Sequence, residues 1–336
     1  LIVTEPVHFD MLDYGGPGVY AQTVDLTDAS AQIDLSARIA NTSDAEQSLK
    51  VSASLIDDSG NTVGSFDTTV AVPAGTTQEL DGTMRVADPR LWNGTVDPYL
   101  HTLRFELRDA QGRVFDTIDQ QFGIRQMEID PERGFILNGN PYRLVGAGMH
   151  QDTEKSDWAV SPEEVDESLR IMLDMGANSL RLSHYQHGTP VHDLADRYGI
   201  VVWDEIGLVT AWTNSRDQTE APADIVENAR AQLRDLVHQN FNHASVAVWG
   251  IANEVDFGPG RPDFLGRPPE VIADPMPLLY NLAELSRELD PNRPVVLANC
   301  CEERGMQDVP VVAEAVDAVG ANRYYGWYYS KPEQLG

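Results

Sequence analysis

The stretch Val246-Ala-Val-Trp-Gly-Ile-Ala-Asn-Glu254 decides the fold, because an uninterrupted apolar run ends abruptly in an asparagine and a glutamate. Such a run is typical of a strand that is buried on both faces. In a parallel (β/α) barrel, the carboxyl ends of the strands carry the chemistry. Burial disfavours charge, so we expect Glu254 to favour its neutral form and to be able to donate a proton. The alternative is a strand that simply ends in an exposed acidic residue.

On both sides of this stretch, from about Asp130 onward, short apolar strands alternate with amphipathic helices. One helix opens at Ser161-Pro-Glu-Glu164, which has the residues of a capping box: serine at the N-cap, proline at the first helical position and glutamate at the third. Regular alternation of this kind predicts a parallel sheet. We expect strands at 143–148, 178–182, 200–203, 246–252, 294–298 and 318–321, and helices at 161–176, 189–199, 222–240 and 276–289.

Polar residues gather just after the expected strands, which places them on one side of the sheet. This placement favours a TIM-type (β/α)8 barrel with a site at its C-terminal rim. An open doubly wound sheet would need a phosphate-binding G-x-G-x-x-G turn, which Gly146-Ala-Gly-Met149 does not supply. Because we count about six strands, we expect the barrel to be truncated at its C-terminal end. The polar residues are His150, His184, Asp204, Glu205, Asn253, Glu254, Asn322 and Tyr324.

Residues 7–127 have a different texture, with apolar and polar residues alternating in short segments such as 33–39 and 50–56. Turn signals rich in Gly, Pro, Asp and Asn separate these segments. The pattern is typical of an all-β, immunoglobulin-like sandwich. The predicted fold is therefore multidomain: a β-sandwich followed by an incomplete α/β barrel.

The chain is strongly acidic, with 53 Asp and Glu against 24 Lys and Arg and a formal net charge of −29. This charge argues against nucleic acid and anionic membranes as partners. No run of 18 apolar residues occurs, so no transmembrane helix is expected. The sequence indicates no particular compartment and leaves the oligomeric state open.

Ordered motifs along the chain resemble glycoside hydrolase family 2, in particular its β-galactosidase branch. The resemblance implies residues 1–6 as the end of a jelly-roll domain, 7–127 as an immunoglobulin-like domain and 128–336 as an incomplete TIM barrel. The motifs are Pro89–Trp92 with Pro98–Leu100, Gly134–Pro141 with His150–Asp152, Arg181–Tyr185, Asp196–Glu205, Trp249–Glu254 and Asn322–Tyr328.

Retaining glycosidases use two carboxylates about 5–5.5 Å apart, one as acid/base and one as nucleophile. The resemblance implies that Glu254 is the acid/base and that Asn253 binds the sugar 2-hydroxyl. The family's nucleophile is a glutamate at the end of the seventh barrel strand, and no residue here matches it. Glu302, Glu303 and Glu314 fall between the fifth and sixth strands, so we assign no nucleophile.

The resemblance implies further contacts at the rim. Arg181 would hold the nucleophile's carboxylate, while His150 and His184 would bind sugar hydroxyls. Asp204 and Glu205 would either contact the substrate or hold histidines and arginines of the rim. The stretch after Glu205 lacks the magnesium ligands of the lactose-cleaving relative, so we expect no metal and no cofactor. The remaining candidates for substrate contact are Tyr185, Asn322, Tyr324 and Trp327.

The leading hypothesis is a retaining exo-β-glycosidase that hydrolyses terminal β-galactosides, with a β-linked oligosaccharide or glycoside as substrate. The alternative within the same family is a β-glucuronidase. An alternative of another class is a non-catalytic carbohydrate-binding fragment. Because half of the carboxylate pair is missing, we expect the isolated 336-residue chain to be inactive.

Overall fold

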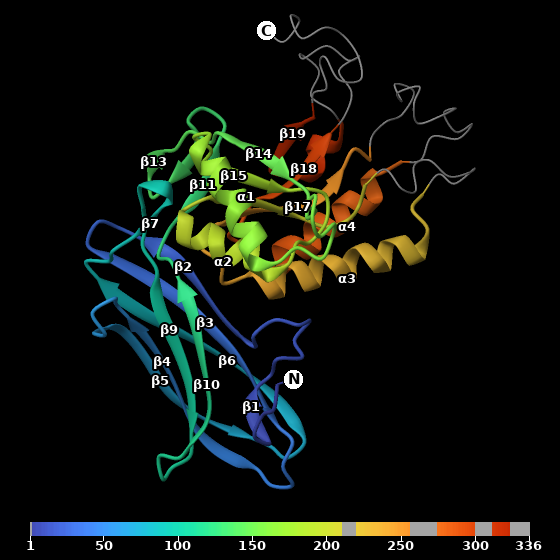
Figure 1. Cartoon of the computed structure of the whole chain (residues 1–336). Coiled ribbons are helices and arrows are strands. Elements are labelled where there is room, and N and C mark those ends of the chain that lie inside the picture. Colours follow the sequence, from blue (N-terminus) through green and yellow to red (C-terminus); the bar gives the residue numbers. More distant parts are fainter. Residues whose placement is uncertain (1, 210–219, 256–273, 300–310, 323–336) are drawn as a thin grey trace, which may run out of the picture. The chain divides into compact units, whose positions relative to one another are not determined.

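The computed structural model describes residues 2–209, 220–255, 274–299 and 311–322 (Figure 1). The chain divides into two compact units, one made of residues 1–181, 187–202 and 235–247 and the other of 182–186, 203–234 and 248–336. The first unit contains the N-terminal β domain and the beginning of a parallel sheet. The second contains most of the residues that the sequence predicts at the functional site.

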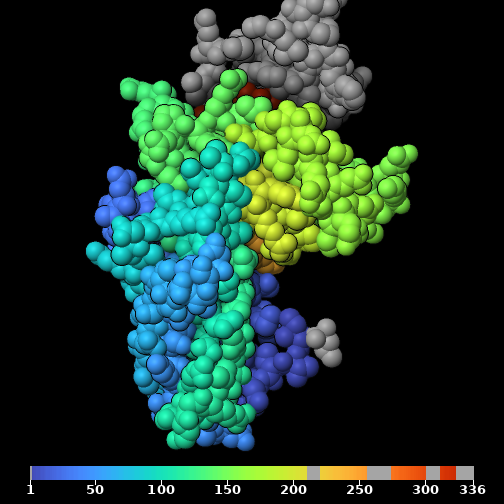
Figure 2. Space-filling model, turned by 60° about the vertical axis from the view of Figure 1, so that its left-hand side comes forward, coloured from blue at the N-terminus to red at the C-terminus, as the bar shows by residue number. Residues whose placement is uncertain are grey.

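The N-terminal domain is a sandwich of two antiparallel four-stranded sheets, which confirms the predicted all-β domain. Figure 2 shows the residues of these strands, coloured blue to green, as one continuous surface on the face in view. One sheet contains β1 (Val7–Phe9), β2 (Val19–Leu26), β3 (Ser30–Asn41) and β6 (Thr76–Ala87). The other contains β4 (Gln47–Ile56), β5 (Thr62–Val72), β9 (His101–Arg108) and β10 (Val114–Phe122).

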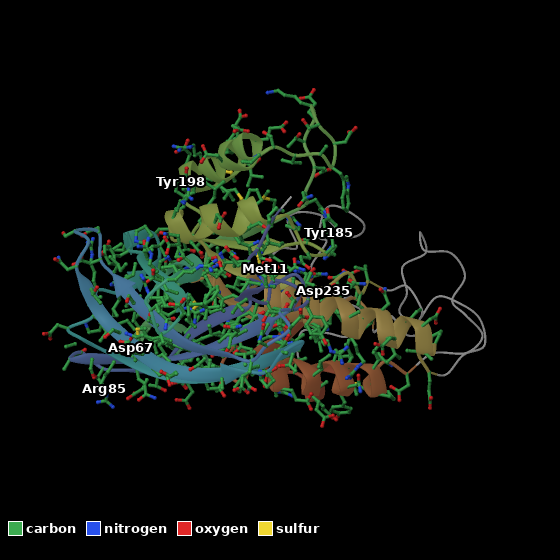
Figure 3. The ribbon with its side chains drawn as sticks, turned by 90° about the horizontal axis from the view of Figure 1, so that it is seen from below. Met11, Asp67, Arg85, Tyr185, Tyr198 and Asp235 are labelled. Atoms are coloured by element: carbon green, nitrogen blue, oxygen red, sulfur yellow. The ribbon has the colours of Figure 1, made fainter. Side chains whose placement is uncertain are left out.

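The core of the sandwich follows from the period-two alternation in the sequence. Along β4, Leu49, Val51, Ala53 and Leu55 are buried, and they join one apolar cluster with side chains from both sheets. Charged residues take the outward positions, as Asp67 of β5 and Arg85 of β6 do (Figure 3). A slip of one residue would expose the whole apolar set, so this pattern fixes the strand register.

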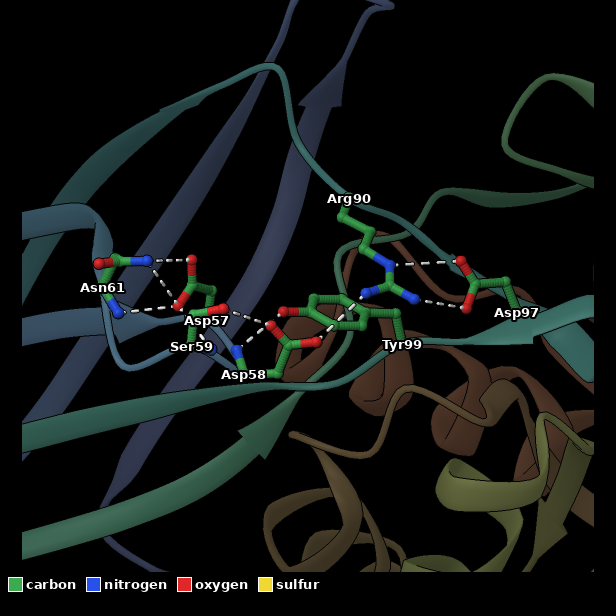
Figure 4. A network of polar contacts seen from close by, with 7 residues as sticks. All are labelled: Asp57, Asp58, Ser59, Asn61, Arg90, Asp97 and Tyr99. Atoms are coloured by element: carbon green, nitrogen blue, oxygen red, sulfur yellow. Dashed lines mark hydrogen bonds and ion pairs between the residues drawn. The ribbon is translucent and has the colours of Figure 1, made fainter.

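Polar contacts around Arg90 connect the turn between β4 and β5 to the segment between β6 and β9 (Figure 4). The guanidinium lies 3.8 Å from the centroid of the Tyr99 ring and pairs with Asp97 at 3.2 Å and Asp58 at 3.4 Å. The Tyr99 hydroxyl accepts a hydrogen bond from the Asp58 backbone N–H. Asp97 lies in the short strand β8 (Asp97–Pro98), and Tyr99 follows that strand. β8 pairs with β7 (Trp92–Asn93), and η1 (Gly94–Val96) connects the two.

The C-terminal half contains a parallel sheet whose six strands follow one another in sequence order, β14-β15-β16-β17-β18-β19. This order confirms the predicted barrel type, because a doubly wound sheet reverses its strand order at a switch point. Within the described residues the structure is therefore a partial (β/α) barrel. The strands are β14 (Gly146–Met149), β15 (Ser179–Leu182), β16 (Val201–Glu205), β17 (Val246–Asn253), β18 (Val295–Asn299) and β19 (Ala318–Ala321).

The helices between the strands lie close to where the sequence predicts them. They are α1 (Pro162–Asp174), α2 (Thr189–Tyr198), α3 (Ala223–Asn240) and α4 (Met276–Leu289). The capping box of α1 is confirmed, since Ser161 accepts from the Glu164 N–H while the Glu164 side chain accepts from the Ser161 N–H. Among the described helices, none combines the length and apolarity needed to cross a bilayer.

Some strand limits differ from the prediction. The first barrel strand starts at Gly146 rather than Arg143, and β16 and β17 extend through Asp204–Glu205 and Asn253. These polar residues are buried, so apolarity alone ends each strand too early. The domain limits at 6/7 and 127/128, together with the jelly-roll assignment of residues 1–6, remain predictions.

The structure also contains a small antiparallel sheet that was not predicted from the sequence. It is made of β11 (Met127–Asp130), β12 (Gly134–Leu137) and β13 (Asn140–Pro141). Asn138 and Gly139, which join β12 to β13, have φ angles of 50° and 76°. An Asn-Gly pair with two positive φ angles is the preferred two-residue hairpin turn. The signal was therefore present in the sequence.

Asp196 of α2 joins several segments of the first unit. Its side chain accepts from the Ser245 N–H and from His243 Nδ1, both at 2.7 Å, and its carbonyl accepts from Trp92 Nε1 at 2.8 Å. Trp92 is fully buried. Asp196 thus binds both the turn before β17 and Trp92 of β7.

Two further side chains connect the sandwich to the turn before β17. The Asn242 amide donates to Val19 O and accepts from the Ala21 N–H, so it pairs with the β2 edge as another strand would. Arg125, which follows β10, donates to the carbonyl oxygens of Ala244 and Val246. These hydrogen bonds satisfy the buried carbonyl and N–H groups where the sandwich meets the turn before β17.

We predict that Asp196→Ala lowers the free energy of unfolding by about 2–4 kcal/mol. The substitution removes the acceptor of the hydrogen bonds from the buried Ser245 N–H and from His243. Urea denaturation monitored by tryptophan fluorescence measures the change. Asp193→Ala, an exposed position on the same helix, is the control and should change stability by less than about 0.5 kcal/mol. Equal effects of the two substitutions would contradict this role of Asp196.

The sandwich should lose stability in mild acid because of His101. Burial lowers the pKa of this imidazole, against smaller opposing contributions from the Phe122 backbone and Asp57. The unfolded chain, with a histidine pKa of about 6.5, then binds more protons than the native state as the pH falls below that value. The contribution of the neutral His101 imidazole to the free energy of unfolding is complete above this pH and is lost progressively below it. Urea titrations between about pH 5 and 7 should show a shallower pH slope for His101→Gln than for the wild type, and identical slopes would refute the assignment.

Candidate active site

Glu254 follows β17 directly and has a relative exposure of 9%. All eight residues of β17 are buried, and Asn253 at its end is 2% exposed. The apolar run therefore does form a doubly buried strand, and the glutamate at its end is not an exposed surface residue. A buried carboxyl group at the C-terminal end of a barrel strand is well placed to meet a ligand.

The backbone at Glu254 is held in an unusual conformation, with a φ angle of 52°. The left-handed region costs a residue with a Cβ about 1–2 kcal/mol. Two hydrogen bonds hold this part of the chain: the Glu254 N–H donates to Ala298 O at 2.8 Å, and the Asn253 N–H donates to Leu208 O at 2.9 Å. Strain of this kind gathers at functional sites, where the surroundings impose it.

Asn322, the residue after β19, is joined to both residues at the end of β17. Its side-chain Nδ2 donates to Glu254 Oε1 at 2.7 Å and to Asn253 Oδ1 at 2.9 Å. Its own backbone N–H donates to Asn299 O at 3.0 Å. Three residues predicted at the site are therefore in direct contact.

A second pair of predicted residues also meets. His184 Nδ1 lies 2.7 Å from Glu205 Oε1, and the glutamate is completely buried inside β16. This contact favours one of the two roles left open for Glu205, that of holding a histidine. Asp204, the other acidic residue of the pair, is also fully buried.

Two glycines make room for this arrangement. A Cβ at Gly250 of β17 would collide with Glu205 Cβ and lie 2.6 Å from Trp203 Nε1. A Cβ at Gly320 of β19 would lie 2.7 Å from the Trp203 ring, although two strands separate β16 from β19 in the sheet. The indole thus crosses the concave side of a curved sheet. Neither glycine was predicted at the site from the sequence, since nothing in their spacing marks them.

The other predicted residues lie in several places. His150 follows β14 and Arg181 is in β15, both in the first compact unit, so their contacts with the sugar and nucleophile remain predictions. Tyr185, half-buried and labelled in Figure 3, follows β15. Tyr324, Trp327, Glu302 and Glu303 lie outside the described residues.

Glu314 is exposed on η4 (Val311–Ala315), where its Oε2 accepts from the hydroxyl of Tyr280 in α4. Over the ranges that the structure describes, no group of three or more His, Cys, Asp or Glu side chains is arranged to hold a metal ion.

Comparison with known proteins relates this chain to sugar-cleaving enzymes. A relative from Bacteroides fragilis named β-glucuronidase is 30% identical over the whole chain, which covers 45% of that protein. The β-galactosidase BoGH2A of Bacteroides ovatus is 28% identical over 95% of this chain and 38% of its own length. A B. fragilis crystal structure described as a candidate β-galactosidase matches with a TM-score of 0.82 and 30% identity, over 97% of this chain and 44% of that one.

This chain thus spans less than half the length of each of these relatives. The family model of glycosyl hydrolases family 2 matches residues 19–125, and the model of that family's TIM barrel domain matches residues 128–335. The second match alone covers more than half of the sequence, so the chain belongs to glycosyl hydrolase family 2.

Proposed function

We propose that the protein carrying this chain is a retaining β-glycosidase in which Glu254 is the general acid/base. The observation that carries the proposal is the buried Glu254 at the end of β17, held by Asn322 and next to Asn253. Membership of a glycoside hydrolase family supports the reaction class.

In the first step Glu254 would protonate the glycosidic oxygen while the C1–O bond breaks and a nucleophile attacks C1. In the second step the Glu254 carboxylate would take a proton from water, which attacks the glycosyl-enzyme intermediate. Asn253 would bind the sugar 2-hydroxyl, a contact that strengthens in the transition state. His184, oriented by Glu205, would bind another hydroxyl. The nucleophile is not assigned to any residue of this chain.

The preference for galactosides that the sequence predicts is not confirmed. Relatives named β-glucuronidase and β-galactosidase match with similar identity, 30% and 28%, and the former spans all of the chain. Both β-glucuronides and β-galactosides therefore stand as candidate substrates. Comparing kcat/KM for nitrophenyl β-glucuronide and β-galactoside in the full-length protein decides between them.

Glu254→Gln should lower kcat/KM for alkyl glycosides by about 10²–10⁴-fold in the full-length protein, because these leaving groups need a proton. Dinitrophenyl glycosides, whose leaving group needs no proton, should lose far less in the first step. Steady-state kinetics with both substrates measures the difference. The matched control is Glu314→Gln on the exposed face of η4, which should leave both rates unchanged.

An unchanged rate for Glu254→Gln with alkyl glycosides would rule out the acid/base assignment. A protein that binds glycosides but releases no sugar with either substrate would instead support the non-catalytic alternative. For the isolated 336-residue chain we expect no turnover, since it lacks an assigned nucleophile, and turnover that depends on Glu254 would show that the nucleophile lies within this chain.

A further inference from the structure

We propose that Asn322 is a positioning residue that determines which oxygen of Glu254 carries the transferred proton. The inference rests on the proposed function of Glu254 and goes beyond the substrate contact predicted for Asn322 from the sequence. It assigns the proton to Oε2 and assigns Oε1 to a permanent hydrogen bond with Asn322.

Both contacts of the Asn322 side chain run through the same atom, Nδ2, which lies 2.7 Å from Glu254 Oε1 and 2.9 Å from Asn253 Oδ1. An amide nitrogen has two N–H donors and no acceptor. One hydrogen is therefore directed at each of the two oxygens.

The carboxyl group of Glu254 forces the orientation of the two asparagine amides. An ionised glutamate can only accept hydrogen bonds, so Asn322 must turn its NH2 group toward it. Because that NH2 group also faces Asn253, Asn253 must present its Oδ1 there and its own NH2 on the opposite side of the amide. The carboxylate thereby sets the orientation of both asparagines.

The position of the proton on the neutral acid also depends on this contact. A proton on Oε1 would point at the N–H of Asn322 across 2.7 Å, which places two positively polarised hydrogens against each other. A proton on Oε2 leaves Oε1 as a carbonyl oxygen, which accepts the N–H without conflict. In the neutral form of Glu254, the contact with Asn322 therefore favours a proton on Oε2 over one on Oε1.

The proton transfer breaks one bond in Glu254 and one in the substrate. The Oε2–H bond breaks, the proton passes to the glycosidic oxygen, and the electron pair of the C1–O bond leaves with the departing alcohol. Glu254 remains as a carboxylate, and its hydrogen bond from Asn322 becomes charge-assisted and stronger. The same contact orients the acid before the transfer and stabilises the base afterwards. The backbone bond from Asn322 N–H to Asn299 O holds the residue in place.

The test uses the full-length protein and two substitutions, Asn322→Ala and Asn322→Asp. The alanine variant removes the donor, so the carboxylate loses stabilisation and the alkaline limb of the kcat/KM profile should move up by about one pH unit. The aspartate variant places a carboxyl group beside Oε1 and draws the proton away from Oε2. It should lower kcat/KM for alkyl glycosides by about 100-fold, in the range for loss of general acid catalysis, and that for dinitrophenyl glycosides only a few-fold.

The matched control is Asn281→Ala, which removes an asparagine side chain of α4 that binds Arg230 and should shift neither the limb nor the leaving-group dependence. Thermal unfolding of each variant identifies general loss of structure. Equal losses for both leaving groups with an unmoved alkaline limb would overturn the role of Asn322. Glu254→Gln, measured in parallel, separates the two claims: if it keeps full activity on alkyl glycosides, the proposed function itself fails.

Discussion

The hydrogen bonds at the two ends of β17 are the constraint on which the rest of this structure depends. At the beginning of the strand, Arg125 donates to Val246 O and Asp196 accepts from the Ser245 N–H. At its end, the N–H groups of Asn253 and Glu254 donate to Leu208 O and Ala298 O. A strand buried along all eight residues cannot leave such groups unpaired without a cost of about 1–3 kcal/mol each. The strained backbone at Glu254 persists because these bonds hold it.

The sandwich takes part in this constraint through polar contacts. Asn242 pairs with the edge of β2, and Trp92 donates to the carbonyl oxygen of Asp196. An exposed sheet edge is a site of unwanted pairing, and a side-chain amide satisfies it with one residue. The N-terminal domain therefore binds the segment that leads into β17, and it contributes no residue to the chemistry that we propose.

Most of the barrel elements could be predicted from the sequence because each depends on local pattern. The capping box at Ser161, the apolar run of β17 and the strand at Ala318 are local signals, and all three are present. Strand ends were harder, since Asp204, Glu205 and Asn253 are polar and yet buried within strands. The hairpin at Asn138-Gly139 was missed although its turn signal is strong.

The contacts of the candidate site could not be predicted, because each joins segments far apart in the sequence. Asn322 meets Glu254 across 68 residues, and His184 meets Glu205 across 21. The need for glycine at position 250 becomes visible only when β16 is placed beside it. The resemblance to a family identified the candidate site residues. Their hydrogen-bond partners became visible only in the folded structure.

Azide rescue of Glu254→Ala in the full-length protein tests the central claim most directly. Removing the acid/base of a retaining enzyme opens space for a small anion, which can attack the glycosyl-enzyme intermediate from the side that water normally takes. With a dinitrophenyl glycoside as substrate, the account predicts that azide accelerates turnover and that the product is a β-glycosyl azide. An α-glycosyl azide would identify Glu254 as the nucleophile instead, and no response to azide in an otherwise folded variant would contradict its role in the reaction.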